Sequence, residues 1–388
     1  LIADRGDLIS SQMIENLSVG NNQVYVDEQL SVVTDQFSLE PVQYGFWMYK
    51  LTYETIDQYG NPHNATGVVS YPRVEWPIVP SEAFPIISYH HGTVIEKASV
   101  SSVTGAWILS AYLSGRGYVY VEPDYLGLGG SAGMHPYQLQ EPYGTAVVDM
   151  LRAVRYYAAF ENEQFVVNDQ LFLAGYSEGG YATMATHQII ERDYSDEFDI
   201  TVSFPMAGAY SLSGIMTDVM LEQQPYGQPF YFPYILFAYL DSYPSIGTVE
   251  QYLLPEYVFL ADWFDGYHSS GEINDAMPEI PITIMKPEEV QIFEEDENHP
   301  LRVALQENDL WDWTPQAPLY LFHGLGDELL LSLVAFLLVV LTPVENNVGM
   351  FLDGFEKFLE HPTEGLIRVP LGTLKGLLIL LSRRHSHF

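Results

Sequence analysis

The sequence predicts an α/β fold in which a mostly parallel central sheet is flanked by helices. Between residues 84 and 204, short apolar runs alternate with longer segments of helical periodicity. The strand-like runs cover residues 84–88, 118–121, 171–174 and 200–204, and the helix-like segments cover 100–113, 143–160 and 179–191. Uninterrupted apolar strands that alternate with helices are typical of a parallel sheet covered on both faces.

The segments on either side of this alternating region predict the domain organisation. Residues 46–56 and 66–72 are rich in aromatic and β-branched side chains and flank a turn cluster, which predicts an antiparallel hairpin. Residues 210–310 are rich in Tyr, Phe, Pro and acids and lack strand alternation, whereas 318–322 resumes it. We expect a core formed by 1–209 and 311–388, with a weakly helical N-terminal extension over 1–40, and an inserted, mainly helical cap over 210–310.

Composition excludes several classes of protein. The 388 residues are 47% hydrophobic, which is enough for a full core and excludes global disorder. With 51 acidic and 15 basic residues the net charge is −36, so nucleic acid and anionic membranes are disfavoured as partners. The chain has no cysteine, which excludes thiolate catalysis and cysteine-bound zinc.

Two further features bear on location. The longest uncharged apolar run, 329–341, is shorter than the roughly 18–20 residues of a membrane-spanning helix, so no integral span is expected. The chain begins at Leu1 and not at Met, which suggests that a preceding segment such as a signal peptide was removed. Together with the acidic composition, this predicts a secreted, extracellular protein, whereas the oligomeric state is left open.

The strongest local signal is a G-x-S-x-G motif around Ser177. It consists of Gly175-Tyr176-Ser177-Glu178-Gly179, and it joins the apolar run 171–174 to a helix-like segment rich in small residues. A serine hydroxyl is a poor nucleophile unless it is exposed and hydrogen-bonded to a base. A sharp strand-to-helix turn exposes it and points the backbone N–H groups of the helix at a developing oxyanion. Ser177 is therefore the predicted nucleophile.

A second loop, Tyr89-His90-His91-Gly92-Thr93, follows the predicted strand 84–88. A glycine-containing loop in this place can offer a backbone N–H to an oxyanion. The predicted donors are the N–H groups of Thr93 and Glu178. The alternative is an ordinary strand-to-helix turn that carries two histidines.

The order of these motifs resembles the α/β-hydrolase superfamily. A His-Gly loop, a G-x-S-x-G motif, an insertion and a His-Gly-x-x-Asp segment follow one another, and residues 123–129 and 135–137 sharpen the likeness. They resemble the secretory lipase family of the fungal lipase-A type and its bacterial esterase relatives. The resemblance implies hydrolysis of carboxylic esters, with small-molecule or lipid esters as substrates, a cap over the pocket, and no metal or organic cofactor.

The resemblance also implies the two other members of a catalytic triad. The family places its acid after a strand like 319–322, which makes Asp327 the candidate, with Glu328 as the alternative. The base comes later in the chain. His361 is the candidate because it precedes a helix-like stretch over 371–381, and His385 is the alternative.

Five residues near these motifs are expected to border the substrate pocket, namely His91, Gly92, Asp124, Tyr125 and Tyr176. For Asp124 and Tyr125, structural support of the loop is the alternative role.

Two rival functions also stay open. One is a serine peptidase or acyltransferase that uses the same triad, because fold alone does not separate these activities. The other is an inactive, hydrolase-like binding protein with an incomplete triad. The tail motivates the second rival, because 329–341 is apolar all round and no glycine precedes His361.

Overall fold

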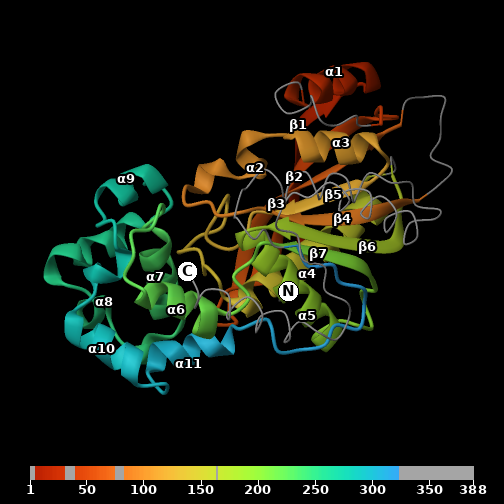
Figure 1. Ribbon diagram of the computed structural model, residues 1–388. Helices are drawn as coiled ribbons and strands as arrows, with labels where there is room; N and C mark the ends of the chain where they lie inside the picture. The colour runs from red at the N-terminus through yellow and green to blue at the C-terminus, as the bar shows by residue number, and fades with distance from the viewer. Residues whose placement is uncertain (1–4, 31–39, 75–82, 163–164, 323–388) are drawn as a thin grey trace, which may run out of the picture.

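The computed structural model describes residues 5–30, 40–74, 83–162 and 165–322 (Figure 1). Within them the chain forms a seven-stranded sheet in the order β1-β2-β3-β5-β4-β6-β7. The strands are β1 (Leu8–Leu17), β2 (Gly45–Ile56), β3 (Pro62–Arg73), β4 (Phe84–His90), β5 (Val119–Pro123), β6 (Val167–Tyr176) and β7 (Ile200–Met206). The helices around this sheet are α1 (Val19–Leu30), α2 (Ser101–Thr104), α3 (Ile108–Gly115), α4 (Gln140–Tyr156) and α5 (Glu178–Asp193).

The sheet has an antiparallel part and a parallel part. β1, β2, β3 and β5 pair antiparallel in that order, and β2 and β3 form the predicted hairpin. β5, β4, β6 and β7 pair in parallel, and residues 319 and 322 continue in parallel beside β7. The predicted α/β architecture is confirmed, and its parallel strands are those that alternate with helices. The sheet as a whole is mixed, because the N-terminal strands add an antiparallel half.

The N-terminal segment differs from the weakly helical extension that the sequence predicts. Its first element is β1, which pairs with β2 and forms the outer strand of the antiparallel half, and only the part after Ser18 is helical. Shifts of register between Leu8 and Ser10 and between Met13 and Glu15 break the alternation of side chains along β1. A strand with such irregularities has no clear period of two, which is why its sequence pattern is weak.

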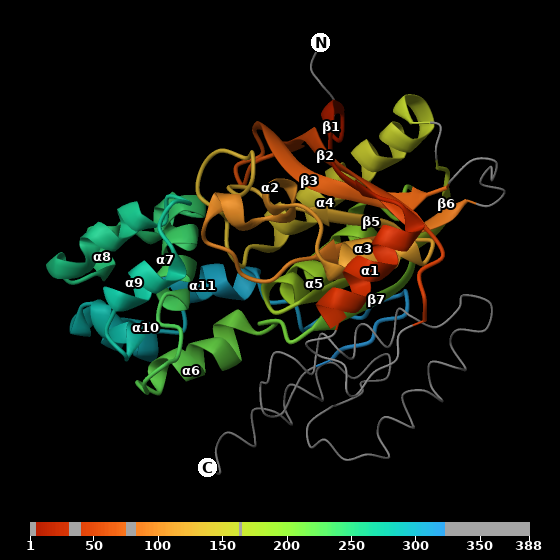
Figure 2. The same ribbon diagram turned by 90° about the horizontal axis from the view of Figure 1, so that it is seen from above.

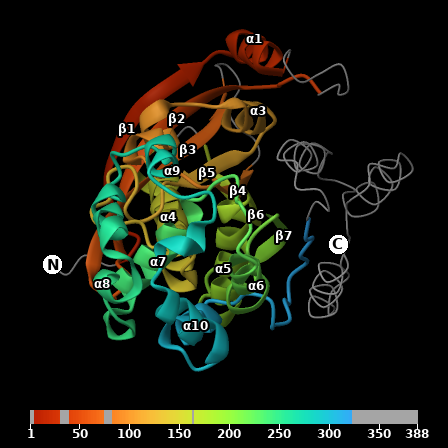
Figure 3. The same ribbon diagram turned by 60° about the vertical axis from the view of Figure 1, so that its left-hand side comes forward.

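Helices cover both faces of the sheet (Figure 3). On one face, Val119 and Val121 of β5 pack with the buried side of α4. On the other face, Tyr120 of the same strand packs with Leu109 and Leu113 of α3. Successive side chains of a strand point to opposite faces, so this short strand contributes to two hydrophobic cores.

Residues 210–310 form helices that gather beyond one end of the sheet, on the left in Figures 1 and 2. They are α6 (Thr217–Leu221), α7 (Tyr231–Ser242), α8 (Val249–Tyr252), α9 (Ser270–Asp275), α10 (Pro287–Glu295) and α11 (Pro300–Glu307). The short 3₁₀ and π segments in the described part of the chain are Lys97–Ser99, Tyr157–Glu161, Leu212–Met216, Pro244–Ile246, Pro255–Trp263 and Pro281–Ile284. Helices thus predominate over residues 210–310, whereas an inserted cap with these boundaries stays a prediction.

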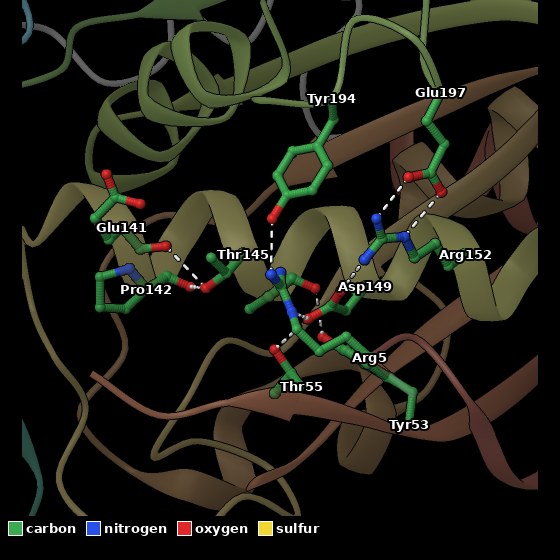
Figure 4. Close-up of polar contacts among 11 residues, drawn as sticks. Arg5, Tyr53, Thr55, Glu141, Pro142, Thr145, Asp149, Arg152, Tyr194 and Glu197 are labelled. Atoms are coloured by element: carbon green, nitrogen blue, oxygen red, sulfur yellow. Dashed lines mark hydrogen bonds and ion pairs between the residues drawn. The ribbon is translucent and has the colours of Figure 1, made fainter. Parts of the chain in front are cut away.

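A buried carboxylate ties the N-terminal segment to the core (Figure 4). The side chain of Asp149 on α4 is fully buried. Its Oδ2 accepts hydrogen bonds from Arg5 Nε at 3.0 Å and from Thr55 Oγ1 at 2.8 Å, and its Oδ1 accepts one from Arg152 Nη1 at 2.9 Å. Arg5 also donates to the Tyr194 hydroxyl at 2.7 Å. This cluster joins the residues before β1 to β2, to α4 and to the end of α5.

Candidate active site

Ser177 stands at the turn between β6 and α5, as the sequence predicts. Its backbone adopts φ 59° and ψ −122°, a conformation that non-glycine residues rarely adopt and that marks functional turns. Two interactions hold it there. The Ser177 N–H donates to the Met206 carbonyl at 2.9 Å, and the Ser177 carbonyl accepts from the Gly180 N–H at 2.9 Å. The side chain is half-buried at the head of α5.

The glycine that ends the motif allows α5 to approach the sheet. A Cβ at Gly179 would overlap the carbonyl oxygen of His90 and lie 2.7 Å from that of His91. A Cβ at Gly175 would lie 2.7 Å from the same His90 oxygen. Any larger residue at either position would push the helix away from the end of β4, so the motif requires glycine on both sides of the turn.

The predicted oxyanion loop lies against this turn. A Cβ built on Gly92 would lie 3.8 Å from Ser177 Cβ and 3.4 Å from the Tyr176 carbonyl oxygen, so the backbone of the loop runs beside the serine. The N–H of Glu178 belongs to the first turn of α5, where N–H groups have no partner within the helix. The roles of Thr93 and Glu178 as oxyanion donors stay a prediction.

His90 is part of the scaffold under this loop. Its ring is fully buried, Nδ1 lies 2.7 Å from Thr183 Oγ1, and Nε2 lies 3.1 Å from Ser88 Oγ. The Thr183 hydroxyl donates to the Gly179 carbonyl at 2.7 Å, so it accepts the proton on His90 Nδ1. Burial lowers the pKa of His90 to about 3, and the ring is therefore neutral near pH 7.

Tyrosines connect the predicted oxyanion loop to helix α7. The Tyr137 hydroxyl lies 3.0 Å from Thr93 Oγ1, and the Tyr234 hydroxyl donates to the Val94 carbonyl at 3.1 Å. The two rings stack in parallel with their centroids 4.3 Å apart. Tyr234 of helix α7 and Tyr137 of the segment before α4 thus hold the consecutive residues Thr93 and Val94.

The predicted pocket residues occupy different environments. Gly92 and Tyr176 are half-buried beside Ser177, whereas His91, Asp124 and Tyr125 are buried. Asp124 Oδ2 accepts hydrogen bonds from Thr66 and Ser102, and the Tyr125 hydroxyl donates to the His91 carbonyl. These bonds favour loop support by Asp124 and Tyr125, the alternative role that the sequence left open.

The structure also reveals a partnership that the sequence reasoning missed. The side chain of Glu178, directly after the nucleophile, is buried, and its Oε1 lies 2.9 Å from His135 Nε2 and accepts from the Tyr143 hydroxyl at 2.8 Å. His135 precedes Glu178 by 43 residues, so local patterns do not connect them. One signal in the sequence could have indicated this pair. Glu178 is an ionisable residue at the start of a helix rich in small residues, and such a helix start packs closely against the sheet.

The remaining triad candidates, Asp327 and His361, and the alternatives Glu328 and His385 lie outside the described residues. In the described part of the chain, no three His, Asp or Glu side chains gather in a way that could hold a metal ion. None of the helices that the structure describes is long and apolar enough to cross a membrane.

Comparison with solved structures identifies the fold. A candidate hydrolase from Legionella pneumophila is 28% identical, with a TM-score of 0.72 over 90% of this chain and 89% of that one. The rice cell wall degrading esterase LipA from Xanthomonas oryzae is 24% identical, with a TM-score of 0.74 over 92% and 96%. This chain has the α/β-hydrolase fold.

More distant and partial matches agree with this fold. Candida antarctica lipase A is 17% identical, with a TM-score of 0.57 over 83% of this chain and 70% of that one. The sequence model of the prolyl oligopeptidase family matches residues 107–231, a stretch that contains Ser177. No curated protein matches the chain in sequence. Together the matches support a serine hydrolase of the α/β-hydrolase fold that is related to lipase and esterase families.

Proposed function

We propose that the protein is a serine carboxylic-ester hydrolase. The observation that carries this proposal is the conformation of Ser177, with φ 59° and ψ −122° at the head of a helix and with the loop of Gly92 beside it. Strained backbone at a helix N-terminus exposes a hydroxyl and surrounds it with N–H donors, which is the arrangement that acyl transfer needs. The similarity to an esterase of the same fold supports an ester as the substrate.

In the proposed mechanism, Ser177 Oγ attacks the ester carbonyl carbon while His361 takes the hydroxyl proton. The N–H groups of Thr93 and Glu178 bind the oxyanion of the tetrahedral intermediate. His361 then protonates the leaving alcohol as the C–O bond breaks, which leaves an acyl-enzyme that water hydrolyses by the same steps. Asp327 orients His361 and stabilises its imidazolium form.

The first test is labelling with a fluorophosphonate probe, which reacts with activated serines, followed by mapping of the modified peptide. We expect stoichiometric labelling at Ser177 in the wild-type protein and none in Ser177→Ala. The control is Ser269→Ala, because Ser269 only caps helix α9, and it should label like the wild type. If the folded wild-type protein is not labelled, the proposal fails and a non-catalytic binding protein becomes the better description.

Peptide hydrolysis is the second candidate, and the match to the prolyl oligopeptidase family favours it. Because the same triad cleaves both kinds of bond, the two functions differ in the rate on matched substrates. An ester and an amide that share one acyl group should be assayed side by side. We expect a value of kcat/KM for the ester at least about a thousandfold above that for the amide, and near-equal values would favour the peptidase.

We also propose that the protein acts outside the cell on a small-molecule or lipid ester. A net charge of −36 supports this location, because a strong excess of one charge keeps a protein soluble and free of polyanions. Activity assayed separately in culture medium and in washed cells of the source organism tests it. Activity confined to the cells would contradict the proposal.

A further inference from the structure

A buried acid–base pair lies directly behind the predicted nucleophile. Glu178 opens helix α5, and its side chain turns into the protein, where it is 0% exposed, while the His135 ring is 2% exposed. Burying a carboxylate is costly unless it is paired and hydrogen-bonded. Glu178 Oε1 has two partners, His135 Nε2 at 2.9 Å and the Tyr143 hydroxyl at 2.8 Å. Glu178 Oε2 has no hydrogen-bond partner within the described residues.

The hydrogen bonds of His135 determine the charge of this pair. Nδ1 lies 2.7 Å from the Leu126 carbonyl oxygen, which can only accept, so Nδ1 carries a proton. Nε2 lies 2.9 Å from Glu178 Oε1 and 3.0 Å from the Tyr143 hydroxyl, whose own proton is donated to Oε1. A lone pair on Nε2 would therefore face a lone pair of Oε1 at 2.9 Å, so a second proton lies between these two atoms. Whether it sits on Nε2 or on Oε1, His135 and Glu178 together carry a net charge of zero.

The pair is close to the place where negative charge develops. Consecutive Cα atoms are about 3.8 Å apart, so the Glu178 carboxyl lies within about 10 Å of the Ser177 reaction centre. The N–H of the same residue is a predicted oxyanion donor. An unneutralised carboxylate at this distance would oppose oxyanion formation by enough to slow the reaction about tenfold.

We propose that His135 is a positioning residue for the reaction. It neutralises the carboxylate of Glu178 and fixes the first turn of α5, so that the Glu178 N–H can bind the oxyanion. His135 acts through Glu178 and does not touch the substrate. The inference rests on the proposed function. It extends that function because it explains how Glu178 can follow Ser177 directly: His135 cancels the negative charge that would otherwise oppose formation of the oxyanion.

A double-mutant cycle tests the proposal with kcat and KM measured per fluorophosphonate-labelled site. His135→Gln should lower kcat about tenfold or more and change KM less than about threefold, because the loss concerns the oxyanion and not ground-state binding. Adding Glu178→Gln to His135→Gln removes the unpaired charge. The double variant should therefore be at least about threefold faster than His135→Gln alone, which a merely structural contact would not produce.

The same helix provides a matched control. A second pair on α5 joins the buried His187 to Glu191, whose side chain is 13% exposed, with His187 Nε2 2.8 Å from Glu191 Oε1 and Nδ1 2.6 Å from Ser203 Oγ. His187 follows Glu178 by nine positions, which is about 14 Å along the helix axis. His187→Gln should lower thermal stability like His135→Gln but leave kcat per labelled site within about twofold of the wild type.

The outcomes separate the two proposals. Absence of labelling at Ser177 in the wild-type protein overturns the proposed function, whereas labelling with an unchanged kcat in His135→Gln overturns this inference alone. A double variant that is no faster than His135→Gln also overturns it. If His135→Gln does not fold, the double variant is compared with Glu178→Gln. The proposal expects values of kcat within about threefold of each other, and a gap above about tenfold contradicts it.

Discussion

The ion pair between Arg5 and Asp149 should stabilise the fold far more than an exposed pair does. Arg5 Nε and Asp149 Oδ2 are 3.0 Å apart, and the side chains are 29% and 0% exposed. Removing one partner of a buried pair costs about 3–5 kcal/mol. Asp149 keeps Thr55 and Arg152 as partners when Arg5 is lost, so we expect a coupling free energy of about 1.5–3 kcal/mol between Arg5 and Asp149.

The measurement is a double-mutant cycle on the free energy of unfolding in urea, with Arg5→Gln, Asp149→Asn and the double variant. The matched control is the pair between Arg192 Nη2 and Glu141 Oε1. These atoms are 2.7 Å apart, and the two side chains are 46% and 57% exposed. Glutamine substitutions there should give a coupling of about 0.5 kcal/mol or less. A coupling below about 0.5 kcal/mol for Arg5 and Asp149 would refute the reasoning that burial strengthens this pair.

Two other predictions concern the site. Gly179→Ala should abolish fluorophosphonate labelling and lower the unfolding free energy by at least about 2 kcal/mol, because its Cβ would overlap the His90 carbonyl. Normal labelling of this variant would contradict the prediction, because it would show that α5 can move without loss of serine reactivity. Burial lowers the pKa of His90 from 6.5 to about 3 in the folded protein. Between these two pH values the unfolded chain binds a proton on His90 that the folded protein does not bind, so lowering the pH destabilises the fold. His90→Gln should reduce the slope of unfolding free energy against pH, measured between pH 4 and 6, by up to about 1.4 kcal/mol per pH unit, and parallel slopes would disprove it.

Sequence periodicity predicted the part of the fold in which apolar strands alternate with helices. The alternating region from β4 to β7 appears where the apolar runs place it. The predicted helix over 100–113 is interrupted, because Gly105 adopts φ +90° and separates α2 from α3. Strand β1 was missed because its register shifts remove the period of two on which strand prediction depends.

The parts of the site that could be predicted are those formed by residues that are consecutive in the sequence. Ser177 and the loop of Gly92 belong to short motifs, and the structure brings them together. The pairing of Glu178 with His135 depends on the way the segment after β5 crosses the head of α5, which no local pattern encodes. Asp327 and His361 rest on a resemblance to a family, and their positions stay a prediction.

The hydrogen bond from the Ser177 N–H to the Met206 carbonyl has a consequence for biosynthesis. Strands β2 and β3 are neighbours in the sequence, so their hairpin can close while the chain is still short. The turn at Ser177, in contrast, gains this bond only when the end of β7, 29 residues further on, has left the ribosome and paired with β6. A nascent chain that ends before β7 carries the complete G-x-S-x-G motif but lacks the strand that holds its serine in place.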